Sequence, residues 1–248
     1  MLISIITAVY NRCDTIGDAL RSLDAQTYPQ REHVVIDGAS TDGTLELLRA
    51  TVGPQTLLVS EPDTGIYEAL NKGIDLARGE VIGLLHSDDF FASPDVLAKV
   101  AAAFATPSVN AVYGDLQYVS AQDTSRVIRH WTAGSPSVAK LRRGWMPPHP
   151  TLFLRREVFE RFGAYDTSYR IAADYDAILR YFGTGEINSA YIPEVLVMMR
   201  VGGESNKSLG KILKKSREDY RALRTNGIGG LGSLAWKNLS KVHQLFLK

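Results

Sequence analysis

The chain has 248 residues and a formal net charge of +1, long enough for one large α/β domain or for a domain with an extension. Hydrophobic residues make up 45% and charged residues 22%, as in an ordinary soluble globular protein, and no apolar run approaches the roughly 20 residues of a transmembrane helix. The single cysteine, Cys13, excludes an intramolecular disulfide and fits a reducing compartment.

Strand and helix patterns alternate along the first 110 residues. The expected strands are Ile3–Val9, His33–Asp37, Thr56–Ser60 and Glu80–Leu85. The expected helices are Thr15–Gln26, a short one after Thr41, Ile66–Ala77, and Pro94–Ala105 with Ser93 as its N-cap. The first strand is apolar without a basic segment, so we expect a core strand rather than a signal peptide. This order predicts a parallel sheet with helices on its faces.

The pattern changes after Asn110. Ala111–Val119 and Arg126–Trp131 show more alternation between apolar and polar residues, and the polar turn Ser120–Ser125 joins them. Further along we expect helices at Ser135–Gly144, Arg156–Phe162 and Asp174–Phe182, and strands at Thr151–Leu154 and Ala190–Arg200. These features predict a mixed sheet in the second half, residues 111–205, after a parallel first half, residues 1–110.

Residues 206–248 form a basic extension to the domain expected over residues 1–205. Helices are expected from Asn206 to about Arg224 and at Leu234–Leu247. From Lys207 onwards ten Lys and Arg residues stand against two acids, a charge of +8, which suggests a tail that meets something anionic. Gly227–Gly232 matches the dinucleotide fingerprint G-x-G-x-x-G, but it follows a basic helix and no acid occurs downstream, so we interpret it as a flexible connector.

Two adjacent carboxylates follow the fourth strand, in the sequence His86-Ser87-Asp88-Asp89. Like charges disfavour each other's ionisation, and a divalent cation together with a ligand hydroxyl would relieve that cost. Mg²⁺ commonly binds one or two carboxylates plus substrate phosphates, and open α/β sheets bind ligands at the carboxyl ends of their strands. The pair therefore predicts a metal–diphosphate site. The alternative is a solvated turn that caps the next helix.

Polar residues also follow the other three strands of the first half. These segments are Thr7–Asn11, Asp37–Thr44 and Ser60–Gly65. In a parallel sheet such ends lie on one edge and line one cleft. Asp37 beside the aromatic Tyr10 suits a nucleobase with an N–H donor, although Tyr10 can instead pad the sheet edge, and Asp42 is better explained as a turn residue. No Walker A sequence is present, so metal and basic groups would hold the phosphates.

Taken in order, these segments resemble family-2 glycosyltransferases of the GT-A fold, an α/β fold with a mostly parallel central sheet flanked by helices. The resemblance runs from Ser4 to about Arg200. It is carried by Thr7–Asn11, Asp37–Thr44, Asp63–Gly73, Gly79–Asp89 and Ala172–Asp176. One such segment would be a weak signal, but all of them at these spacings are specific.

The resemblance implies a nucleotide-sugar-binding half over residues 1–110, with a donor site at the first strand ends, and an acceptor half over residues 111–205. Thr7, Ala8 and Tyr10 would bed the base of a nucleotide sugar, and Asp37 would accept its N–H. Arg200, at the start of a loop with Gly202 and Gly203, would be a cation that closes over the diphosphate. A surface salt bridge is the alternative for Arg200.

The resemblance also assigns the acids nearest the reaction. Asp88 would hold the ribose, and Asp89, the last acid of a DxD-like motif, would bind Mn²⁺ or Mg²⁺ on the diphosphate. Asp174 matches the catalytic acid near the start of a helix. The commoner family form has Glu before this Asp, where this chain has Ala173, so Asp176 is a competitor. Asp174 as a simple N-cap is the other alternative.

His149 lies in the sequence Pro147-Pro148-His149-Pro150, where three prolines hold the backbone rigidly. Two interpretations stay open for its side chain. It touches the acceptor, the diphosphate or the metal, or it makes a hydrogen bond in the core.

The chemistry agrees with these assignments. An acceptor hydroxyl is a poor nucleophile until a positioned carboxylate takes its proton. The sugar transition state is oxocarbenium-like, and a metal neutralises the departing diphosphate. One base opposite the leaving group gives a single displacement with inversion. We therefore predict an inverting, metal-dependent transferase that moves a sugar from a nucleotide donor, UDP-linked in our first choice, to a hydroxyl of a glycan or lipid-linked acceptor.

Two other functions remain open. A sugar nucleotidyltransferase would use the same acidic pair on a nucleoside triphosphate, although no glycine-rich loop with Lys or Arg follows the first strand. A catalytically silent nucleotide-sugar-binding module is the second, although Asp174 is retained.

The tail suggests the partners. We expect it to contact anionic membrane, with shallow anchors at Trp236, Leu245 and Phe246. Its apolar helix face consists of Leu209, Ile212, Leu213, Tyr220 and Leu223. Alternatively, this face packs on the catalytic domain or on a second copy in a homodimer. We expect a cytoplasmic protein, at the inner face of the membrane if the tail binds it, and no nucleic-acid partner.

Overall fold

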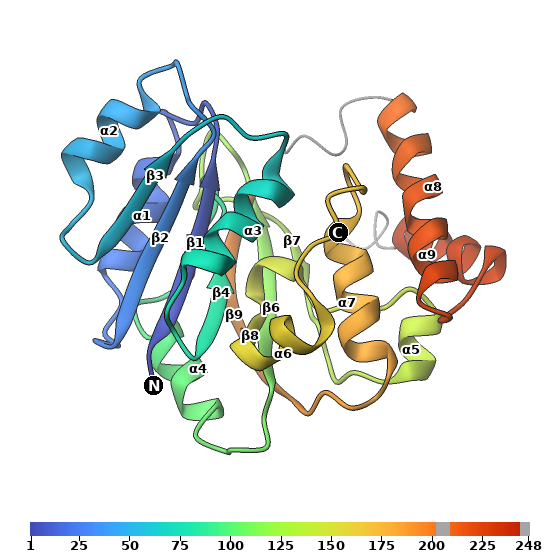
Figure 1. Ribbon diagram of the computed structural model, residues 1–248. Coiled ribbons are helices and arrows are strands. Elements are labelled where there is room, and N and C mark those ends of the chain that lie inside the picture. Colours follow the sequence, from blue (N-terminus) through green and yellow to red (C-terminus); the bar gives the residue numbers. More distant parts are fainter. Residues whose placement is uncertain (202–208, 244–248) are drawn as a thin grey trace.

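The computed structural model describes residues 1–201 and 209–243 of the chain. Within them one nine-stranded sheet runs in the order β3-β2-β1-β4-β8-β6-β9-β5, with β7 paired to β6 (Figure 1). The strands are β1 Ile3–Val9, β2 Arg31–Asp37, β3 Thr56–Ser60, β4 Val81–Leu84, β5 Phe90–Phe91, β6 Ala111–Val119, β7 Val127–Trp131, β8 Phe153–Arg155 and β9 Ser189–Arg200. The helices are α1 Ile16–Asp24, α2 Thr44–Thr51, α3 Ile66–Leu76, α4 Val96–Ala103, α5 Val138–Arg142, the 3₁₀ turn η1 His149–Thr151, α6 Arg156–Phe162, α7 Ala173–Gly183, α8 Leu209–Thr225 and α9 Leu231–His243.

β1 lies at the centre of the parallel part of the sheet, between β2 and β4. All of its residues are buried, because a parallel strand is covered on both faces, and this explains its nearly continuous apolar sequence. β3 extends this part in parallel with β2. The ends of these four strands therefore share one edge, as the sequence predicts.

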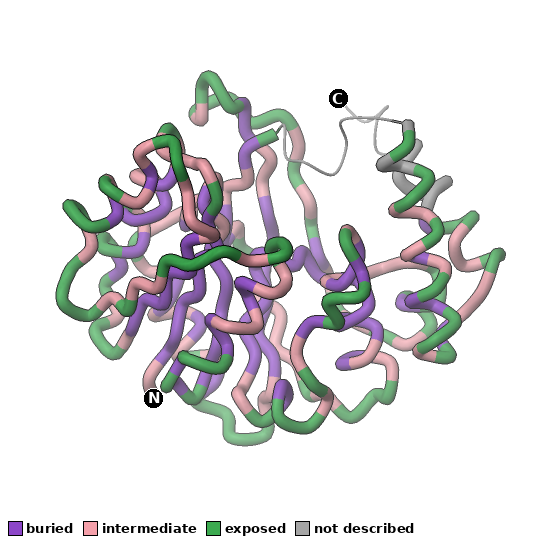
Figure 2. The backbone as a smooth tube through the Cα atoms, turned by 45° about the horizontal axis from the view of Figure 1, so that its top comes forward, coloured by how far each residue is buried: buried purple, intermediate pink, exposed green. Residues whose placement is uncertain are grey.

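Helices cover both faces of the sheet, with one apolar core on each side. α3, α6 and α7 pack on one face, and α1, α2 and α4 pack on the other. α3 approaches β1 closely, since a Cβ on Gly73 would lie only 2.4 Å from Cγ2 of Ile6. Figure 2 shows the buried segments running along the strands between these two layers.

The second half of the chain makes the sheet mixed, as expected. β6 pairs in parallel with β9 and antiparallel with β7 and β8. The short strand β5 is absent from the sequence analysis. It pairs antiparallel with β9, with Phe90 opposite Met198, so the segment directly after Asp89 lies beside the end of β9 at Arg200.

Several elements start two or three residues away from the predicted position, and for two of them the side-chain contacts show why. α4 begins at Val96 with Asp95 at its N-cap, because the Ser93 hydroxyl bonds to the Asp95 carboxylate instead of capping the helix. β8 begins at Phe153, because Thr151 belongs to η1 and its hydroxyl donates to the Gly114 carbonyl at 2.9 Å.

The C-terminal helices α8 and α9 lie beside α7, on the opposite side of the molecule from α2 (Figure 1). Ala222 and Leu223 of α8 are buried in the core that α7 shares. A buried ion pair joins α8 to α9, with Nζ of Lys237 2.9 Å from Oδ2 of Asp219. The C-terminal half of α8 therefore packs on the catalytic domain, the alternative that the sequence analysis left open for this helix.

The expected apolar face of α8 is divided. Leu223 is buried, whereas Leu213 is 68% exposed, and the side chains of Leu209 and Ile212 lie outside what the structure describes. Trp236 on α9 is exposed, and Leu245 and Phe246 fall outside the described residues, as does the proposed boundary at residues 205 and 206. No helix within residues 1–201 and 209–243 is long and apolar enough to cross a membrane.

Candidate active site

Asp89 sits in a tight turn after β4, where its backbone N–H donates to the His86 carbonyl at 3.0 Å. Its side chain is buried, with the residue 1% exposed. Oδ1 accepts from the backbone N–H of Arg200 at 3.2 Å, while Oδ2 has no hydrogen-bond partner within the described part of the chain. Burial first, and the neighbouring Asp88 second, raise the pKa of Asp89 well above its usual range.

A buried carboxylate oxygen without a partner is costly, and a divalent cation is the partner that would remove the cost. Asp89 therefore fits the predicted role as a metal ligand. Among the described residues, no three His, Cys, Asp or Glu side chains converge on one point as a metal site. Asp88 is half-buried beside Asp89 at the same edge of the sheet.

Arg200 holds this turn from β9. Its guanidinium donates through Nη1 to the Asp88 carbonyl at 2.7 Å and through Nη2 to the carboxylate of Asp18 in α1. It also lies 5.1 Å from the centre of the Phe90 ring. Arg200 is 8% exposed, so in this structure its donors support the acidic turn. The loop proposed to follow it, residues 202–205, lies outside the described residues.

The edge beside β2 carries the predicted base-binding residues. Asp37 is buried, and its carboxylate accepts from the hydroxyl of Ser40 and, at 2.6 Å, from that of Ser60. Tyr10 is 58% exposed. Thr7 and Ala8 are buried inside the sheet, and the Thr7 hydroxyl donates to the Leu85 carbonyl at 2.8 Å. The Thr7 side chain thus ties β1 to β4.

Asp63 is a further candidate donor-site residue, to which the sequence alone assigned no role. A Cβ on Gly38 would lie 2.6 Å from Oδ2 of Asp63 and 3.4 Å from Cδ2 of Tyr10. The carboxylate and the ring therefore converge on Gly38, directly after β2. Its place after β3, at the same sheet edge as Asp37, was the signal that could have identified it.

Asp174 lies in the first turn of α7 and is half-buried. Its Oδ1 is 3.3 Å from the hydroxyl of Tyr67 in α3, which also donates to the Ile171 carbonyl at 2.7 Å. The N-cap of α7 is Ala172, so Asp174 is not the N-cap that we kept as an alternative. Burial and, next, the charge of Asp174 raise the pKa of Tyr67 well above its usual range, so the phenol stays protonated.

Two histidine rings lie next to each other near the acidic pair. The rings of His86 and His149 are 5.8 Å apart, and Nε2 of His149 is 2.8 Å from the Tyr165 hydroxyl. Burial lowers the pKa of His86, while the charges of Asp88 and Asp174 oppose that shift. Burial lowers the pKa of His149 to about 4, so this ring is neutral at pH 7. Asp88 and Asp174, from two distant segments, therefore both act electrostatically on His86.

Asp176, the competing base, is held inside the protein. It is buried, and its carboxylate accepts from Nη2 of Arg180 at 3.2 Å and from Nδ2 of Asn226 at 2.8 Å. Asp174 is the more accessible of the two acids, and its described contact is to Tyr67, on the side of the acidic pair. This geometry favours Asp174 over Asp176.

Residues 4–167 match the family model described as Glycosyl transferase family 2. The chain belongs to this family. A PGL/p-HBAD biosynthesis glycosyltransferase of Mycobacterium bovis is 32% identical over 216 residues, which cover 85% of this chain and 81% of the relative. An uncharacterized glycosyltransferase of Mycobacterium tuberculosis is 33% identical over 186 residues, covering 72% of this chain and 68% of the relative.

Solved structures confirm the GT-A fold of this family-2 glycosyltransferase. S. aureus TarS 1–349 in complex with UDP-GlcNAc matches with a TM-score of 0.72 at 18% identity, over 92% of this chain and 66% of that one. The mannosyltransferase PcManGT of Pyrobaculum calidifontis, in complex with GDP-Man and Mn²⁺, matches with a TM-score of 0.65 at 22% identity, over 90% of this chain and 63% of that one. The chain spans 39% of the longer TarS chain.

Proposed function

We propose that this glycosyltransferase transfers a sugar, with inversion, from a UDP-linked donor to a hydroxyl of a glycan or lipid-linked acceptor. The observation that carries the proposal is that two acids in different surroundings both lie near His86: the backbone N–H of Asp89 donates to the His86 carbonyl, and the charge of Asp174 acts on the His86 ring. Asp89 is buried and has an oxygen without a partner in the described residues, whereas Asp174 is half-buried and hydrogen-bonded to Tyr67. Asp89 is therefore suited to bind a cation, and Asp174 is suited to accept a proton.

On the donor side, Tyr10 would stack on the base while Asp37 or Asp63 accepts its N–H, and Asp88 would hold the ribose. Asp89 would hold Mn²⁺ or Mg²⁺, which when bound neutralises charge on the leaving diphosphate. Two solved structures support a nucleotide-sugar donor, since TarS is in complex with UDP-GlcNAc and PcManGT with GDP-Man and Mn²⁺.

On the acceptor side, Asp174 would take the proton of the attacking hydroxyl. The Tyr67 hydroxyl lies 3.3 Å from Oδ1 of Asp174 and so would orient the carboxylate. A general base of this kind must reach the proton that it removes, and contributes typically 10²–10⁴-fold to the rate. His149 would be an uncharged neighbour of the base, because burial lowers its pKa to about 4. Its Nε2 is already hydrogen-bonded to the Tyr165 hydroxyl.

Thermal-shift measurements with UDP, GDP and dTDP, each with and without Mn²⁺ or Mg²⁺, test the donor site. We expect UDP with a cation to raise the melting temperature most. Release of UDP from UDP-GlcNAc and other UDP-sugars then tests turnover. Stabilisation by GDP alone would correct the nucleotide, and no stabilisation by any nucleotide would contradict the proposal.

The two rival functions have their own signatures. A nucleotidyltransferase would release pyrophosphate from a nucleoside triphosphate and a sugar 1-phosphate, which we expect not to occur. A silent binding module would bind the nucleotide sugar without releasing nucleotide from it. Either result would contradict a transferase.

We further propose peripheral contact of the tail with anionic lipid. The groove along α8 is lined by Gly210, Leu213, Lys214, Arg217, Glu218 and Arg221. Lys214, Arg217 and Arg221 are exposed around the exposed Leu213, a pairing of basic and apolar groups that suits a lipid interface. Co-sedimentation with anionic and neutral vesicles tests it, comparing the full chain with a Leu213→Ser, Lys214→Ser variant for the groove and with a chain ending at Asn226 for the final segment. Equal, negligible pelleting on anionic vesicles at low salt would remove the proposal.

A further inference from the structure

One carboxylate from the tail holds the loop that leads into α7. Oε2 of Glu218, in α8, accepts from three consecutive backbone N–H groups: Ile171 at 2.8 Å, Ala172 at 3.0 Å and Arg170 at 3.1 Å. Hydrogen bonds to a charged acceptor are about twice as strong as neutral ones. These N–H groups also lie at the N-terminal end of α7, where negative charge is favourable.

The helix cannot supply this cap from its own sequence. Its N-cap residue is Ala172, whose side chain has no oxygen to accept from the first backbone N–H groups of the helix. Such groups need an acceptor from elsewhere. Glu218, which lies 44 positions beyond Asp174 in the sequence, accepts from one of them, the N–H of the N-cap Ala172, and from the two loop N–H groups before it.

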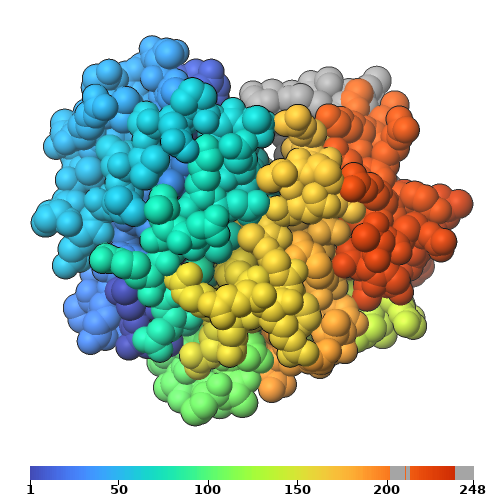
Figure 3. All heavy atoms as spheres, viewed as in Figure 1, coloured from blue at the N-terminus to red at the C-terminus, as the bar shows by residue number. Residues whose placement is uncertain are grey.

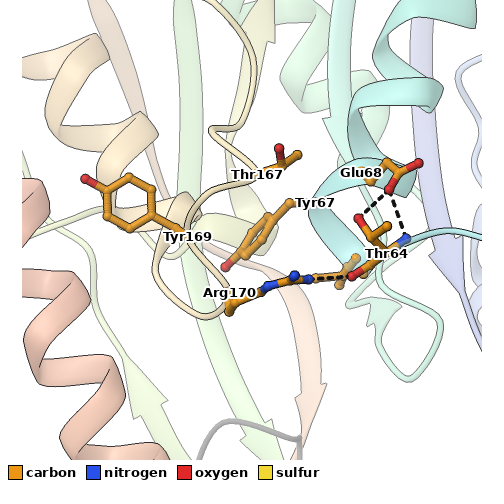
Figure 4. Close-up of a pocket in the computed structure, with 8 residues that line it drawn as sticks. Thr64, Tyr67, Glu68, Thr167, Tyr169 and Arg170 are labelled. Atoms are coloured by element: carbon orange, nitrogen blue, oxygen red, sulfur yellow. Dashed lines mark hydrogen bonds between the residues drawn. The ribbon is translucent and has the colours of Figure 1, made fainter.

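The opposite side of the same loop is fixed by the start of α3. The Tyr67 hydroxyl donates to the Ile171 carbonyl at 2.7 Å, and Nη1 of Arg170 donates to the Thr64 carbonyl at 2.8 Å. Figure 4 shows Arg170 reaching across to Thr64, with Tyr67 beside it, along a small pocket. Both backbone polar groups of Ile171 are therefore hydrogen-bonded to other elements: the carbonyl to Tyr67 of α3 and the N–H to Glu218 of α8.

The arrangement places the loop between two distant segments. In Figure 3 the residues around 160–170 lie between those of α3 on one side and the tail on the other. α8 itself is anchored, because Asp219 pairs with Lys237 and Nη2 of Arg221 donates to the Ser168 hydroxyl at 2.8 Å. The two acids of an otherwise basic tail thus both make structural contacts.

We propose that Glu218 is a positioning residue for Asp174, and that the tail is therefore part of the catalytic unit. The inference rests on the proposed role of Asp174 as base. Glu218 fixes Ile171, and both Ile171 and Asp174 bond to the hydroxyl of Tyr67. Asp174 lies in the first turn of α7, two residues after the last N–H that Glu218 accepts. Loss of the carboxylate releases three N–H groups and moves the base relative to the acceptor.

The test compares Glu218→Ala and Glu218→Gln with the full chain, using the UDP-sugar that gives turnover in the panel above. A misplacement of about 1 Å can cost on the order of 10²-fold in rate, so we expect kcat of Glu218→Ala to fall by about that factor. The donor KM should stay within about twofold, because the donor residues lie elsewhere. Glu218→Gln keeps an acceptor oxygen, so it should lose less. Glu46→Ala, at an exposed position in α2, is the matched control.

A second measurement needs no substrate. Hydrogen–deuterium exchange over residues 167–176 should be faster in Glu218→Ala than in Glu46→Ala, because the three amides lose their acceptor. If Glu218→Ala does not fold, the same comparison is made with Glu218→Gln, where a smaller increase in exchange and a smaller fall in kcat are expected.

The double variant separates positioning from general destabilisation. In an Asp174→Asn background, Glu218→Ala should cause little further loss, because it acts through Asp174. Unchanged kcat and unchanged exchange in both Glu218 variants would overturn the inference, and so would equal, additive losses in the two backgrounds. If Asp174→Asn itself is fully active, the proposed base is wrong, whereas an inactive Asp174→Asn beside a fully active Glu218→Ala overturns only the role of Glu218.

Discussion

The turn after β4 and the loop before α7 each present an acid to the site, but they are held in different ways. Asp89 lies in the turn after a buried parallel strand, where a local hydrogen bond to the His86 carbonyl shapes the turn and Arg200 of β9 supports it. Asp174 follows an irregular loop whose main contacts come from α3 and from α8. An acid of the first kind is recognisable from its neighbours in the sequence, whereas one of the second kind depends on distant segments.

The two acids also differ in their electrostatic surroundings. Asp89 is buried with an oxygen that has no partner in the described residues, and its raised pKa records the cost of that burial. Asp174 is half-buried and receives a hydrogen bond from a phenol. The contrast suggests that Asp89 binds a cation and that Asp174 acts as a base. The following experiments test whether the contrast is real.

Asp174→Asn should have the largest effect. The substitution keeps the shape and the contact with Tyr67 but removes the basic oxygen, so kcat should fall by about 10²–10⁴-fold with little change in donor KM. Steady-state kinetics of nucleotide release measure both values. Asp176→Asn is the comparison, and an inactive Asp176→Asn beside an active Asp174→Asn would show that the base is misassigned.

Asp89→Asn should come next, with kcat/KM lower by about 10²–10³-fold, the range seen when an electrostatic stabiliser of the transition state is removed. The cation-dependent thermal shift with UDP should disappear. Because burying the charge of Asp89 is costly, the melting temperature without ligand should stay equal or rise. The exposed Asp14→Asn serves as control, and a variant that keeps cation-dependent binding would refute the metal role.

The buried histidines should make stability fall in mild acid. Burial lowers the pKa of His33 to about 4, against about 6.5 in the unfolded chain. Between these two values the unfolded state binds a proton that the folded state does not, so the free energy of unfolding decreases as the pH falls. The expected loss between pH 7 and pH 5 is about 2 kcal/mol for this one group.

Denaturant unfolding at pH 7, 6 and 5 measures this loss. His33→Gln should flatten the dependence by the same amount, whatever its effect at pH 7. His33 lies in β2. This experiment therefore probes the stability of the sheet under the proposed donor site and does not probe the loop before α7. An unchanged pH dependence in the variant would mean that His33 is not the titrating group.

Tyr67→Phe should have the smallest effect and would sharpen the comparison. The phenol bridges Ile171 and Asp174, and a typical hydrogen bond contributes about 1 kcal/mol, so kcat should fall by about fivefold. Donor binding should not change, because Tyr67 supports the acceptor side. Tyr220→Phe in α8 is a control for removal of a tyrosine hydroxyl. An increase in donor KM with constant kcat would contradict this prediction, because it would show that Tyr67 supports donor binding instead of the base.

Much of the donor side was predictable from sequence. Continuous apolar runs predict buried parallel strands, and topology alone then brings their carboxyl ends to one edge. Asp37, Asp88 and Asp89 were assigned to the donor site in this way, and that assignment stays a prediction. The family resemblance predicted the fold, which the structure confirms. What the sequence did not show was the state of each group: that Ser40 and Ser60 already donate to Asp37, or that Arg200 turns toward Asp18.

The acceptor side was decided by tertiary structure. The motif at Ala172–Asp176 contains two candidate acids, and only packing separates them, since Asp176 is buried against Arg180 and Asn226 while Asp174 faces Tyr67. The strand β5, too short to show a periodic pattern, became visible only through its pairing with β9.

The sequence by itself determined the layers of the fold, the family and the edge where the site lies, because these depend on patterns within short segments. Tertiary structure decided that Asp174 is more accessible than Asp176, that Arg200 is bonded to the Asp88 carbonyl and to Asp18, and that the tail packs on α7 through α8. The physical reason is that hydrogen bonds such as that of Glu218 to Ile171 join groups far apart in the chain, and their worth depends on burial and on the partners that folding brings within reach.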